Sequence, residues 1–206
     1  MRFDAPALAS SLARRHRTVG FRNRRAAVLL PLMGPDDDLS LLLTRRSQEM
    51  SSHRGQVAFP GGHVDASDGT LENTALREAN EEVGLPPSAV CVLGMLDDLP
   101  TINNKTMVTP VVGRVGGISF DELRPSSAEV DRIFTVPVNR LMEPTAWEER
   151  QETWRGGQMR AFYFEHSGET LWGMSAYFTL MLMTSLAPEL GVKPPFTLDR
   201  LDITDD

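Results

Sequence analysis

Apolar and polar positions alternate along the first quarter of the chain in a pattern that predicts a β-hairpin. Residues 25–33 and 39–45 are mostly aliphatic, and the segment 34–38 between them is Gly-Pro-Asp-Asp-Asp, a run of turn-forming residues. Clusters of Gly, Pro and Asn separate further strand-like stretches, which lie at 90–96, 107–115, 133–137 and 160–165. The pattern therefore predicts a fold with several strands.

A helix is predicted to end at Gly84. With about 100° of rotation per residue, four apolar side chains fall within one sector and form a stripe that would face a core: Ala75, Leu76, Ala79 and Val83. Gly84 suits the C-terminal cap, and the two prolines just beyond it prevent the helix from continuing.

Two more helices are predicted towards the ends of the chain. Residues 5–16 have an amphipathic pattern. Residues 173–186 contain methionines among large apolar residues, and we interpret these methionines as core filler rather than as a binding stripe. Helices before, between and after the strands predict an α/β sandwich.

The composition predicts one soluble domain. With 206 residues, of which 41% are hydrophobic, the chain can bury one sizeable core. Its longest apolar runs, such as residues 26–33, are far shorter than the roughly 20 residues of a membrane span. The single cysteine, Cys91, excludes an intrachain disulfide and lies in a strand-like run. We therefore expect its side chain to be buried and the compartment to be reducing and cytoplasmic.

The net charge of −7 argues against general binding of nucleic acid. The charge is unevenly distributed, because the first 25 residues contain seven arginines and one acid, Asp4. They could form a solvated helix face, an arginine collar for a polyanionic substrate, or a transit peptide. The last is disfavoured because the segment runs directly into a predicted core strand. The arginines are Arg2, Arg14, Arg15, Arg17, Arg22, Arg24 and Arg25.

Three carboxylates gather on the central predicted helix. Glu78, Glu81 and Glu82 lie within five residues, and Glu78 and Glu82 are only about 40° apart around the helix axis. Like charges this close raise one another's pKa unless a positive charge lies among them. A solvated acidic face is the common alternative. The upstream Gly61-Gly62 pair favours a site, because glycines let the backbone come close to a metal and to phosphates.

The type of side chain indicates the type of metal. Carboxylate oxygens are hard ligands, so the predicted ion is Mg²⁺ or Mn²⁺, whereas zinc would need clustered His and Cys. Arg77 precedes these acids and could bind a carboxylate of the preceding loop, which would hold that loop against the helix. We predict that Glu78, Glu81 and Glu82 are the metal ligands and that, with Arg77, they are the catalytic residues.

These residues resemble the signature of the Nudix hydrolases. The family pattern is Gly, five residues, Glu, seven residues, Arg-Glu-U-x-Glu-Glu-x-Gly-U, where U is usually a bulky aliphatic residue. Residues 77–85, Arg-Glu-Ala-Asn-Glu-Glu-Val-Gly-Leu, match its second half. The first half departs from it, because one extra residue separates Gly62 from Arg77, and Asp68 stands where the glutamate is expected. Glu72 is the alternative, but it would fall on the apolar stripe, so we prefer Asp68.

This departure resembles the coenzyme A diphosphatase branch of the family. That branch has an upstream motif, which here is Leu-Leu-Thr-Arg-Arg-Ser at 42–47 and Gly-Gln-Val-Ala-Phe-Pro-Gly-Gly at 55–62. Ser51 stands where the branch usually has a basic residue, and Arg54 could replace it. Further matching segments follow in the expected order, so that the resemblance spans roughly residues 40–180; they lie at 108–112, 134–137 and 171–176.

The resemblance implies a Nudix α/β/α sandwich with a mixed central sheet, and a single domain over residues 1–206. In this layout, residues 1–24 are the Arg-rich N-terminal helix and lead-in, 25–190 the catalytic core, and 191–206 a surface tail. It also implies that substrate is bound by Arg45, Arg46, Gly61 and Gly62. A homodimer is left open, and neither nucleic acid nor a membrane is expected as a partner.

The implied reaction is hydrolysis of the diphosphate linkage of coenzyme A or its derivatives, giving 4′-phosphopantetheine and adenosine 3′,5′-bisphosphate. The sequence does not identify the general base. The candidates are Glu81 and three acids that the pattern places in loops, Glu129, Glu148 and Glu149. His53 could approach the substrate or stabilise a turn. Two other functions remain: a Nudix hydrolase of another nucleoside diphosphate derivative, such as ADP-ribose or a dinucleotide, and a non-catalytic nucleotide-sensing module.

Overall fold

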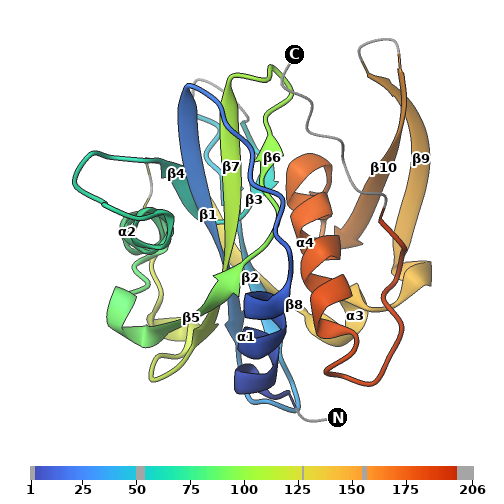
Figure 1. Cartoon of the computed structure of the whole chain (residues 1–206). Coiled ribbons are helices and arrows are strands. Elements are labelled where there is room, and N and C mark those ends of the chain that lie inside the picture. The colour runs from blue at the N-terminus through green and yellow to red at the C-terminus, as the bar shows by residue number, and fades with distance from the viewer. Residues whose placement is uncertain (1–2, 50–53, 127, 155–156, 199–206) are drawn as a thin grey trace.

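A mixed β-sheet forms the centre of the computed structural model, which describes residues 3–49, 54–126, 128–154 and 157–198 (Figure 1). Its strands follow the order β3-β2-β1-β7-β5, while β4, β6 and β8 pair with β1, β7 and β2. β1 and β7 are parallel, and the other pairs are antiparallel. The bounds are β1 (Arg24–Met33), β2 (Ser40–Arg46), β3 (Val57–Ala58), β4 (Gly61–His63), β5 (Val90–Met95), β6 (Leu99–Pro100), β7 (Thr106–Val115) and β8 (Val130–Pro137).

The predicted hairpin of β1 and β2 is confirmed. Leu32 pairs with Leu41 near the turn, where Gly34 has a φ of +88° that favours glycine. On its other edge β1 pairs in parallel with β7. Parallel neighbours need a long crossover connection, and this one contains helix α2 (Leu71–Val83), which packs back onto both strands.

Helices cover both faces of the sheet, as predicted (Figure 1). On one face, α2 places Ala75, Ala79 and Val83 in a buried cluster with residues of β1 and β7. α1 and α4 lie on the other face. The remaining bounds are α1 (Ala5–Arg14), α3 (Val138–Leu141) and α4 (Gly173–Leu186), and the short 3-10 helices are Pro87–Ala89, Phe120–Glu122 and Pro144–Ala146.

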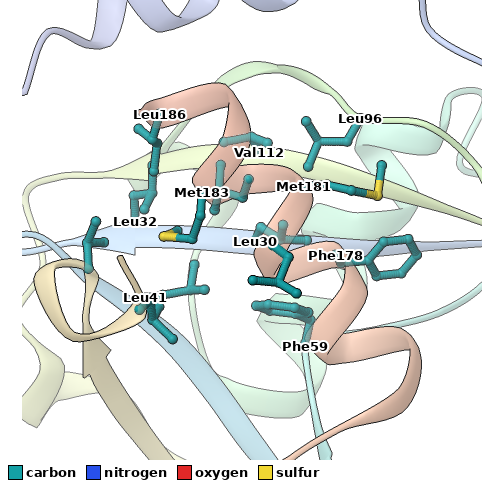
Figure 2. Packing of buried hydrophobic residues seen from close by; sticks show 14 of the residues in the cluster. Leu30, Leu32, Leu41, Phe59, Leu96, Val112, Phe178, Met181, Met183 and Leu186 are labelled. Atoms are coloured by element: carbon teal, nitrogen blue, oxygen red, sulfur yellow. The ribbon is translucent and has the colours of Figure 1, made fainter. Parts of the chain in front are cut away.

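The larger core lies between the sheet and α4. Figure 2 shows Phe178, Met181 and Met183 of α4 packed with Leu30 of β1, and all four are buried. The interpretation of the α4 methionines as core filler is therefore confirmed at these positions. None of the helices in the described part of the chain combines the length and the apolar character that crossing a bilayer needs.

A second, antiparallel sheet lies beyond α4, and the sequence pattern predicts only its middle strand. It consists of β9 (Trp147–Trp154), β10 (Gly157–His166) and β11 (Glu169–Leu171), in the order β11-β10-β9. The expectation that Glu148 and Glu149 lie in a loop is wrong, because both belong to β9. These charges do not interrupt the strand because Glu148 binds Arg150 and Glu149 binds Arg160.

The expectation that Cys91 is buried is also wrong, because its side chain is exposed. Cys91 lies on β5, which is the last strand in the order of the main sheet, and Leu93 of the same strand is buried. An apolar run predicts a strand, but it does not specify which of the side chains another element will cover. The reducing, cytoplasmic compartment and the oligomeric state stay predictions.

Some of the N-terminal arginines form ion pairs instead of a free basic surface. α1 ends before Arg15, so Arg15 and Arg17 lie in the lead-in to β1. Arg15 binds Asp97, and Arg17 Nη1 lies 3.3 Å from Asp98 Oδ1. These pairs hold the lead-in against the segment after β5, a structural role that none of the three interpretations predicts. Arg2 lies outside the described residues.

The segment predicted as a surface tail, residues 191–206, packs on the fold for part of its length. The ring centroids of Phe196 and Phe162 are 4.9 Å apart, and Leu198 also lies against the larger core. Residues 199–206 lie outside the described part of the chain.

Candidate active site

The caps of α2 and its apolar side determine how its acidic side chains project. The helix begins after Thr70, whose hydroxyl oxygen accepts a hydrogen bond from the Asn73 N–H at 3.2 Å. It ends at Gly84, which has a φ of +68° and caps the helix as predicted. Because Ala75 and Ala79 are fully buried against the sheet, the rotation of the helix about its axis is fixed.

Gly61 and Gly62 bring the backbone of β4 against two of the acids. The Gly61 N–H donates a hydrogen bond to Glu82 Oε2 at 3.1 Å. A Cβ on Gly62 would lie 2.5 Å from the carboxyl carbon of Glu78, so glycine leaves room for this carboxylate. A Cβ on Gly61 would collide with the carbonyl oxygen of Ala27 on β1. The backbone of β4 thus lies close to both acids, while its approach to a metal and to phosphates and the role of the two glycines in substrate binding stay predictions.

The three acids differ strongly in exposure, although helix arithmetic places them on one exposed sector. Glu82 is only 3% exposed, whereas the Glu81 side chain is 57% exposed and that of Glu78 is 15% exposed. Burial raises the pKa of Glu82 to about 7, and it also raises the pKa of Glu78. The acidic face is therefore partly turned into the protein, beneath the glycine pair.

Arg77 binds the preceding loop, as predicted. Its Nε and Nη2 donate to the two carboxylate oxygens of Asp68 at 2.8 and 3.1 Å, and Nη2 also donates to the His63 carbonyl at 3.1 Å. The Arg77 guanidinium holds the pKa of Asp68 well below its usual range. The Thr74 hydroxyl donates to the same carboxylate at 2.8 Å. These contacts favour Asp68 over Glu72 as the acid that takes the place of the glutamate in the family pattern.

The same arginine also lies between two of the predicted metal ligands. Arg77 Nη1 is 2.9 Å from Glu78 Oε1 and 3.0 Å from Glu81 Oε2. In the described ranges, no three His, Cys, Asp or Glu side chains converge around one point as ligands. Glu78 and Glu82 nevertheless fit a hard divalent cation, because both are largely shielded from solvent, the charge of Glu78 helps to raise the pKa of Glu82, and both offer only oxygen atoms. The ligand roles of all three glutamates stay predictions.

Arg45 and Arg46 are neighbours in β2, but their side chains make contacts on different sides of the strand. Arg46 Nη1 lies 3.8 Å from Glu82 Oε1, beside α2. Arg45 Nη1 donates to Glu169 Oε1 at 3.1 Å, at the second sheet. Successive side chains of a strand point to opposite faces, and a β-bulge here shifts the pairing of β2 with β8. Their predicted role in binding substrate is untested, but Arg46 is the one placed beside an acid of α2.

A further acid approaches α2 from the loop before β8. The Ser126 N–H donates to the Glu82 carbonyl at 2.8 Å, which ties this loop to the end of the helix. The negative charge of Glu129 is one of the smaller causes that raise the pKa of both Glu78 and Glu82. Of the three acids expected in loops, Glu129 is the one that the structure places in a loop beside α2.

The sequence pattern does not indicate Glu169, which connects the two sheets. This residue is 7% exposed, and its Oε1 accepts hydrogen bonds from Arg45 at 3.1 Å and from Arg132 at 2.8 Å. No local pattern signals such a contact, because the three residues are far apart in the sequence and meet only in the fold. Two positions from the sequence analysis, Ser51 and His53, lie outside the described residues.

Comparison with known proteins identifies the family. The model of the NUDIX domain matches residues 22–155. The chain belongs to the Nudix family. Over 155 residues it is 42% identical to an uncharacterized Nudix hydrolase NudL of Photorhabdus laumondii, covering 75% of this chain and 80% of the relative. An uncharacterized Nudix hydrolase NudL of Salmonella dublin is 37% identical over 180 residues, which cover 87% of this chain and 88% of the relative.

A solved structure agrees with this fold. A MutT/nudix family protein from Enterococcus faecalis has a TM-score of 0.55 at 13% identity, covering 92% of this Nudix chain and 71% of that chain. That likeness shows the mixed α/β Nudix fold alone. Family membership makes the protein a phosphoanhydride hydrolase that acts on a nucleoside diphosphate derivative. Nudix enzymes typically use a divalent metal ion and bind nucleotide-derived small molecules.

Proposed function

We propose that this Nudix hydrolase cleaves the diphosphate linkage of coenzyme A or one of its derivatives, giving 4′-phosphopantetheine and adenosine 3′,5′-bisphosphate. The observation that carries the proposal is how the two halves of the upstream motif pack. They form neighbouring strands, with Thr44 opposite Ala58, and they bring Arg46 and Gly61 to Glu82. Segments that resemble the coenzyme A branch are therefore adjacent to the acids in space.

The chain's own residues would hold and orient the metal. Glu78 and Glu82 would bind Mg²⁺ or Mn²⁺, with Glu81 at the exposed edge of the same cluster. When bound, the ion neutralises phosphate oxygens and lowers the pKa of a coordinated water. Arg77 keeps Glu78 in place by tying it to the preceding loop, and the Gly61 N–H orients the Glu82 carboxylate.

Arg46 is the arginine best placed to bind a phosphate group. Its Nη1 is 3.8 Å from Glu82, beyond hydrogen-bond length, and its Nε is buried without a hydrogen-bond partner among the described residues. A buried donor that lacks a partner is costly, and phosphate oxygens are strong acceptors for a guanidinium. Arg45 would instead support β2 from the second sheet through Glu169.

Glu129 is the acid we assign as general base. The loop that carries it is anchored at both ends, because the Ser126 N–H binds the Glu82 carbonyl and the Glu129 carbonyl accepts from the Ser47 N–H, each at 2.8 Å. Its side chain is exposed, so a water molecule can reach it. Glu148 and Glu149 are less suitable because each binds an arginine of the second sheet.

The direct test is product analysis with three substrates in parallel. The purified protein is incubated with coenzyme A, ADP-ribose and a diadenosine polyphosphate, in Mg²⁺, in Mn²⁺ and in chelator, and the products are separated by chromatography. We expect metal-dependent release of adenosine 3′,5′-bisphosphate from coenzyme A, well above the other turnovers. Glu82→Gln serves as the matched control for contaminating phosphatases.

The other outcomes separate the alternatives. Preferred hydrolysis of ADP-ribose or of the dinucleotide would reject coenzyme A as the substrate and retain the metal site. Binding without turnover of any of the three would favour the nucleotide-sensing module and overturn the proposal.

A further inference from the structure

A buried carboxylate, Glu169, binds two arginines that face each other across a strand pair of the main sheet. Arg45 of β2 and Arg132 of β8 are direct partners in the antiparallel pairing of these strands. Like charges directly opposite each other destabilise a strand pair. Glu169 of β11 is only 7% exposed, and its Oε1 accepts hydrogen bonds from Arg45 Nη1 at 3.1 Å and from Arg132 Nη1 at 2.8 Å. The carboxylate thus turns a repulsive pair into an attractive contact of three charges.

This contact lies where the pairing of β2 with β8 becomes irregular. Directly after the arginine pair, Arg46 of β2 is opposite Val130, so that Asp131 of β8 has no partner on β2. Such an extra residue is a β-bulge, and a bulge changes the direction of the strand and of its side chains. On the other side of the bulge, the Ser47 N–H donates to the Glu129 carbonyl at 2.8 Å. The arginine pair and this backbone hydrogen bond therefore enclose the bulge from both sides.

Glu169 and the acids of α2 lie on opposite sides of the main sheet, and β2 connects them. Arg45 shares its face of β2 with Leu43, which belongs to the larger core. Arg46 points to the other face, where its Nη1 is 3.8 Å from Glu82 Oε1. Glu169 therefore does not act on the substrate directly. It acts through the backbone of β2, because a shift of Arg45 is passed to the next residue of the strand.

Asp131 also lies near the arginine pair, but it cannot take the place of Glu169. Its Oδ2 is 4.0 Å from Arg45 Nε, and its side chain is 28% exposed, so that solvent screens the interaction. The same oxygen accepts a hydrogen bond from the Gln48 N–H at 3.3 Å. Removing the charge of Glu169 would leave two opposed arginines without a buried counter-charge among the described residues.

We propose that Glu169 is a positioning residue of the hydrolase, which fixes the bulge in the β2–β8 pairing and thereby sets Arg46 to bind the phosphates of the substrate. The proposal rests on the proposed function, in which Arg46 binds a phosphate group. Misplacing a group by about 1 Å at a reacting centre lowers the rate about 10²-fold. A carboxylate outside the substrate site thus controls catalysis through the strand that carries the phosphate-binding arginine.

The kinetic test compares Glu169→Gln with a matched control, Glu165→Gln, on the substrate that the product analysis identifies. Both variants keep the shape of the side chain and remove its charge. Glu165 is on β10 of the same sheet and accepts a hydrogen bond from Thr170 at 2.6 Å. Its neighbour Phe164 faces the larger core, so Glu165 points to the outer face, away from the arginine pair.

We expect Glu169→Gln to lower kcat/KM about 10- to 100-fold and to raise KM, because a displaced Arg46 binds the phosphates less well. Glu165→Gln should change each constant by less than about twofold. A purely structural loss would reduce the fraction of active protein, which lowers kcat and leaves KM unchanged. The change in KM therefore distinguishes positioning from general destabilisation.

Two double variants test the path of the effect and its cause. In Arg46→Ala, which has already lost the phosphate contact, adding Glu169→Gln should lower kcat/KM by less than about twofold. Adding Arg132→Gln to Glu169→Gln removes one of the two opposed charges, so it should restore most of the lost kcat/KM. An equal loss with and without Arg46, or no recovery with Arg132→Gln, would contradict the proposal.

Amide hydrogen exchange measures the bulge without any substrate. The Ser47 amide is bonded to the Glu129 carbonyl across the bulge, so its exchange rate reports whether this contact opens. We expect Glu169→Gln to accelerate exchange at Ser47 about tenfold or more. The Leu29 amide, which donates to the Pro60 carbonyl at 2.8 Å, is the reference and should exchange as in the wild-type protein.

These measurements separate this proposal from the proposed function. Unchanged exchange at Ser47 or an unchanged kcat/KM in Glu169→Gln would overturn the positioning role and leave the hydrolase intact. If coenzyme A is not the substrate, the same comparisons are made with ADP-ribose or the dinucleotide.

If none of the three is turned over, calorimetric titration with inorganic pyrophosphate in Mg²⁺ replaces the rates. Weaker binding in Glu169→Gln than in Glu165→Gln would support the positioning role, and equal binding would overturn it. Should Glu169→Gln fail to fold, Glu169→Asp keeps the charge but moves it back by one methylene group. It should show the same changes in KM and in Ser47 exchange, with smaller amplitude.

Discussion

Two buried carboxylates of this Nudix hydrolase, Asp98 and Glu82, have opposite surroundings. Asp98 is completely buried, and its oxygens lie 3.3 Å from Arg17 and 3.5 Å from Arg25. It also accepts a hydrogen bond from the Thr109 hydroxyl at 2.7 Å. Its charge is thus compensated within the fold, by the lead-in to β1 and by two strands of the main sheet.

Glu82 is almost as buried, but it has much less compensation. It accepts one backbone hydrogen bond from Gly61, and the nearest guanidinium, that of Arg46, is 3.8 Å away. Burial raises its pKa to about 7. A buried carboxylate in such surroundings is costly unless a ligand supplies positive charge. The comparison indicates that Asp98 belongs to the scaffold, and it supports the proposal that Glu82 is held for a cation.

The largest expected effect is the loss of stability when Asp98, the scaffold carboxylate of this comparison, is replaced. Asp98→Ala leaves Arg17 and Arg25 without their shared partner in a buried position, so we expect the free energy of unfolding to fall by about 3 to 5 kcal/mol. Urea unfolding followed by circular dichroism measures it. The exposed Asp121→Ala is the control and should change stability by less than about 0.5 kcal/mol. Equal stabilities for the two variants would contradict the assigned scaffold role.

On the functional side, Glu82→Gln keeps the shape of the side chain and removes its charge. We expect kcat/KM to fall about 10²- to 10³-fold, because a neutral amide binds a divalent cation poorly. Initial rates over a range of Mg²⁺ concentrations measure it. The fold should persist, which circular dichroism checks. Full activity with unchanged Mg²⁺ dependence would show that Glu82 is not a ligand.

The same variant should stabilise the metal-free protein at high pH. Between pH 4.5, the ordinary pKa of this carboxyl group, and about 7, the folded protein binds more protons at Glu82 than the unfolded chain does. Stability contributed by this group is therefore present below pH 4.5 and is lost as the pH rises through 7. In chelator at pH 8, Glu82→Gln should gain about 1 to 3 kcal/mol over the wild-type protein.

Urea unfolding at pH 4 and pH 8 tests this, and the difference between the two proteins cancels the contributions of other carboxylates. Mg²⁺ should raise the stability of the wild-type protein at pH 8 more than that of Glu82→Gln. If the wild-type protein were more stable than Glu82→Gln at pH 8 in chelator, the charge of Glu82 would not destabilise the metal-free fold. That result would contradict the contrast between Glu82 and Asp98.

The smallest expected effect concerns the N-terminal arginines. Arg17→Ala leaves Asp98 paired with Arg25, so the free energy of unfolding should fall by only about 1 kcal/mol. KM for the substrate should not change, because this arginine binds the scaffold carboxylate. Steady-state kinetics beside thermal unfolding measures both. A raised KM with normal stability would restore the interpretation of an arginine collar.

Much of the acidic site could be predicted from neighbouring residues. The apolar stripe of α2, the cap at Gly84 and the contact between Arg77 and Asp68 are all confirmed. Each depends on residues less than ten positions apart, so the sequence itself constrains their geometry. The resemblance to Nudix proteins adds the chemistry of the site, which spacing alone does not specify.

The features that the sequence pattern predicted wrongly or missed depend instead on contacts between distant segments. β9 carries so many charges that it does not resemble a strand, yet pairing with β10 and ion pairs with its own neighbours make it one. The exposure of Cys91, the burial of Glu82 and the separate contacts of Arg45 and Arg46 all depend on which distant segment covers each side chain. Local pattern does not contain that information.

The amino-acid sequence by itself determined the central helix, its caps, the acidic cluster and the family, because these depend on periodicity, capping and spacing within short segments. Tertiary structure alone decided that the charge of Asp98 is compensated and that of Glu82 is not. Compensation of a buried charge depends on partners contributed by remote strands, whose meeting is a property of the packed molecule.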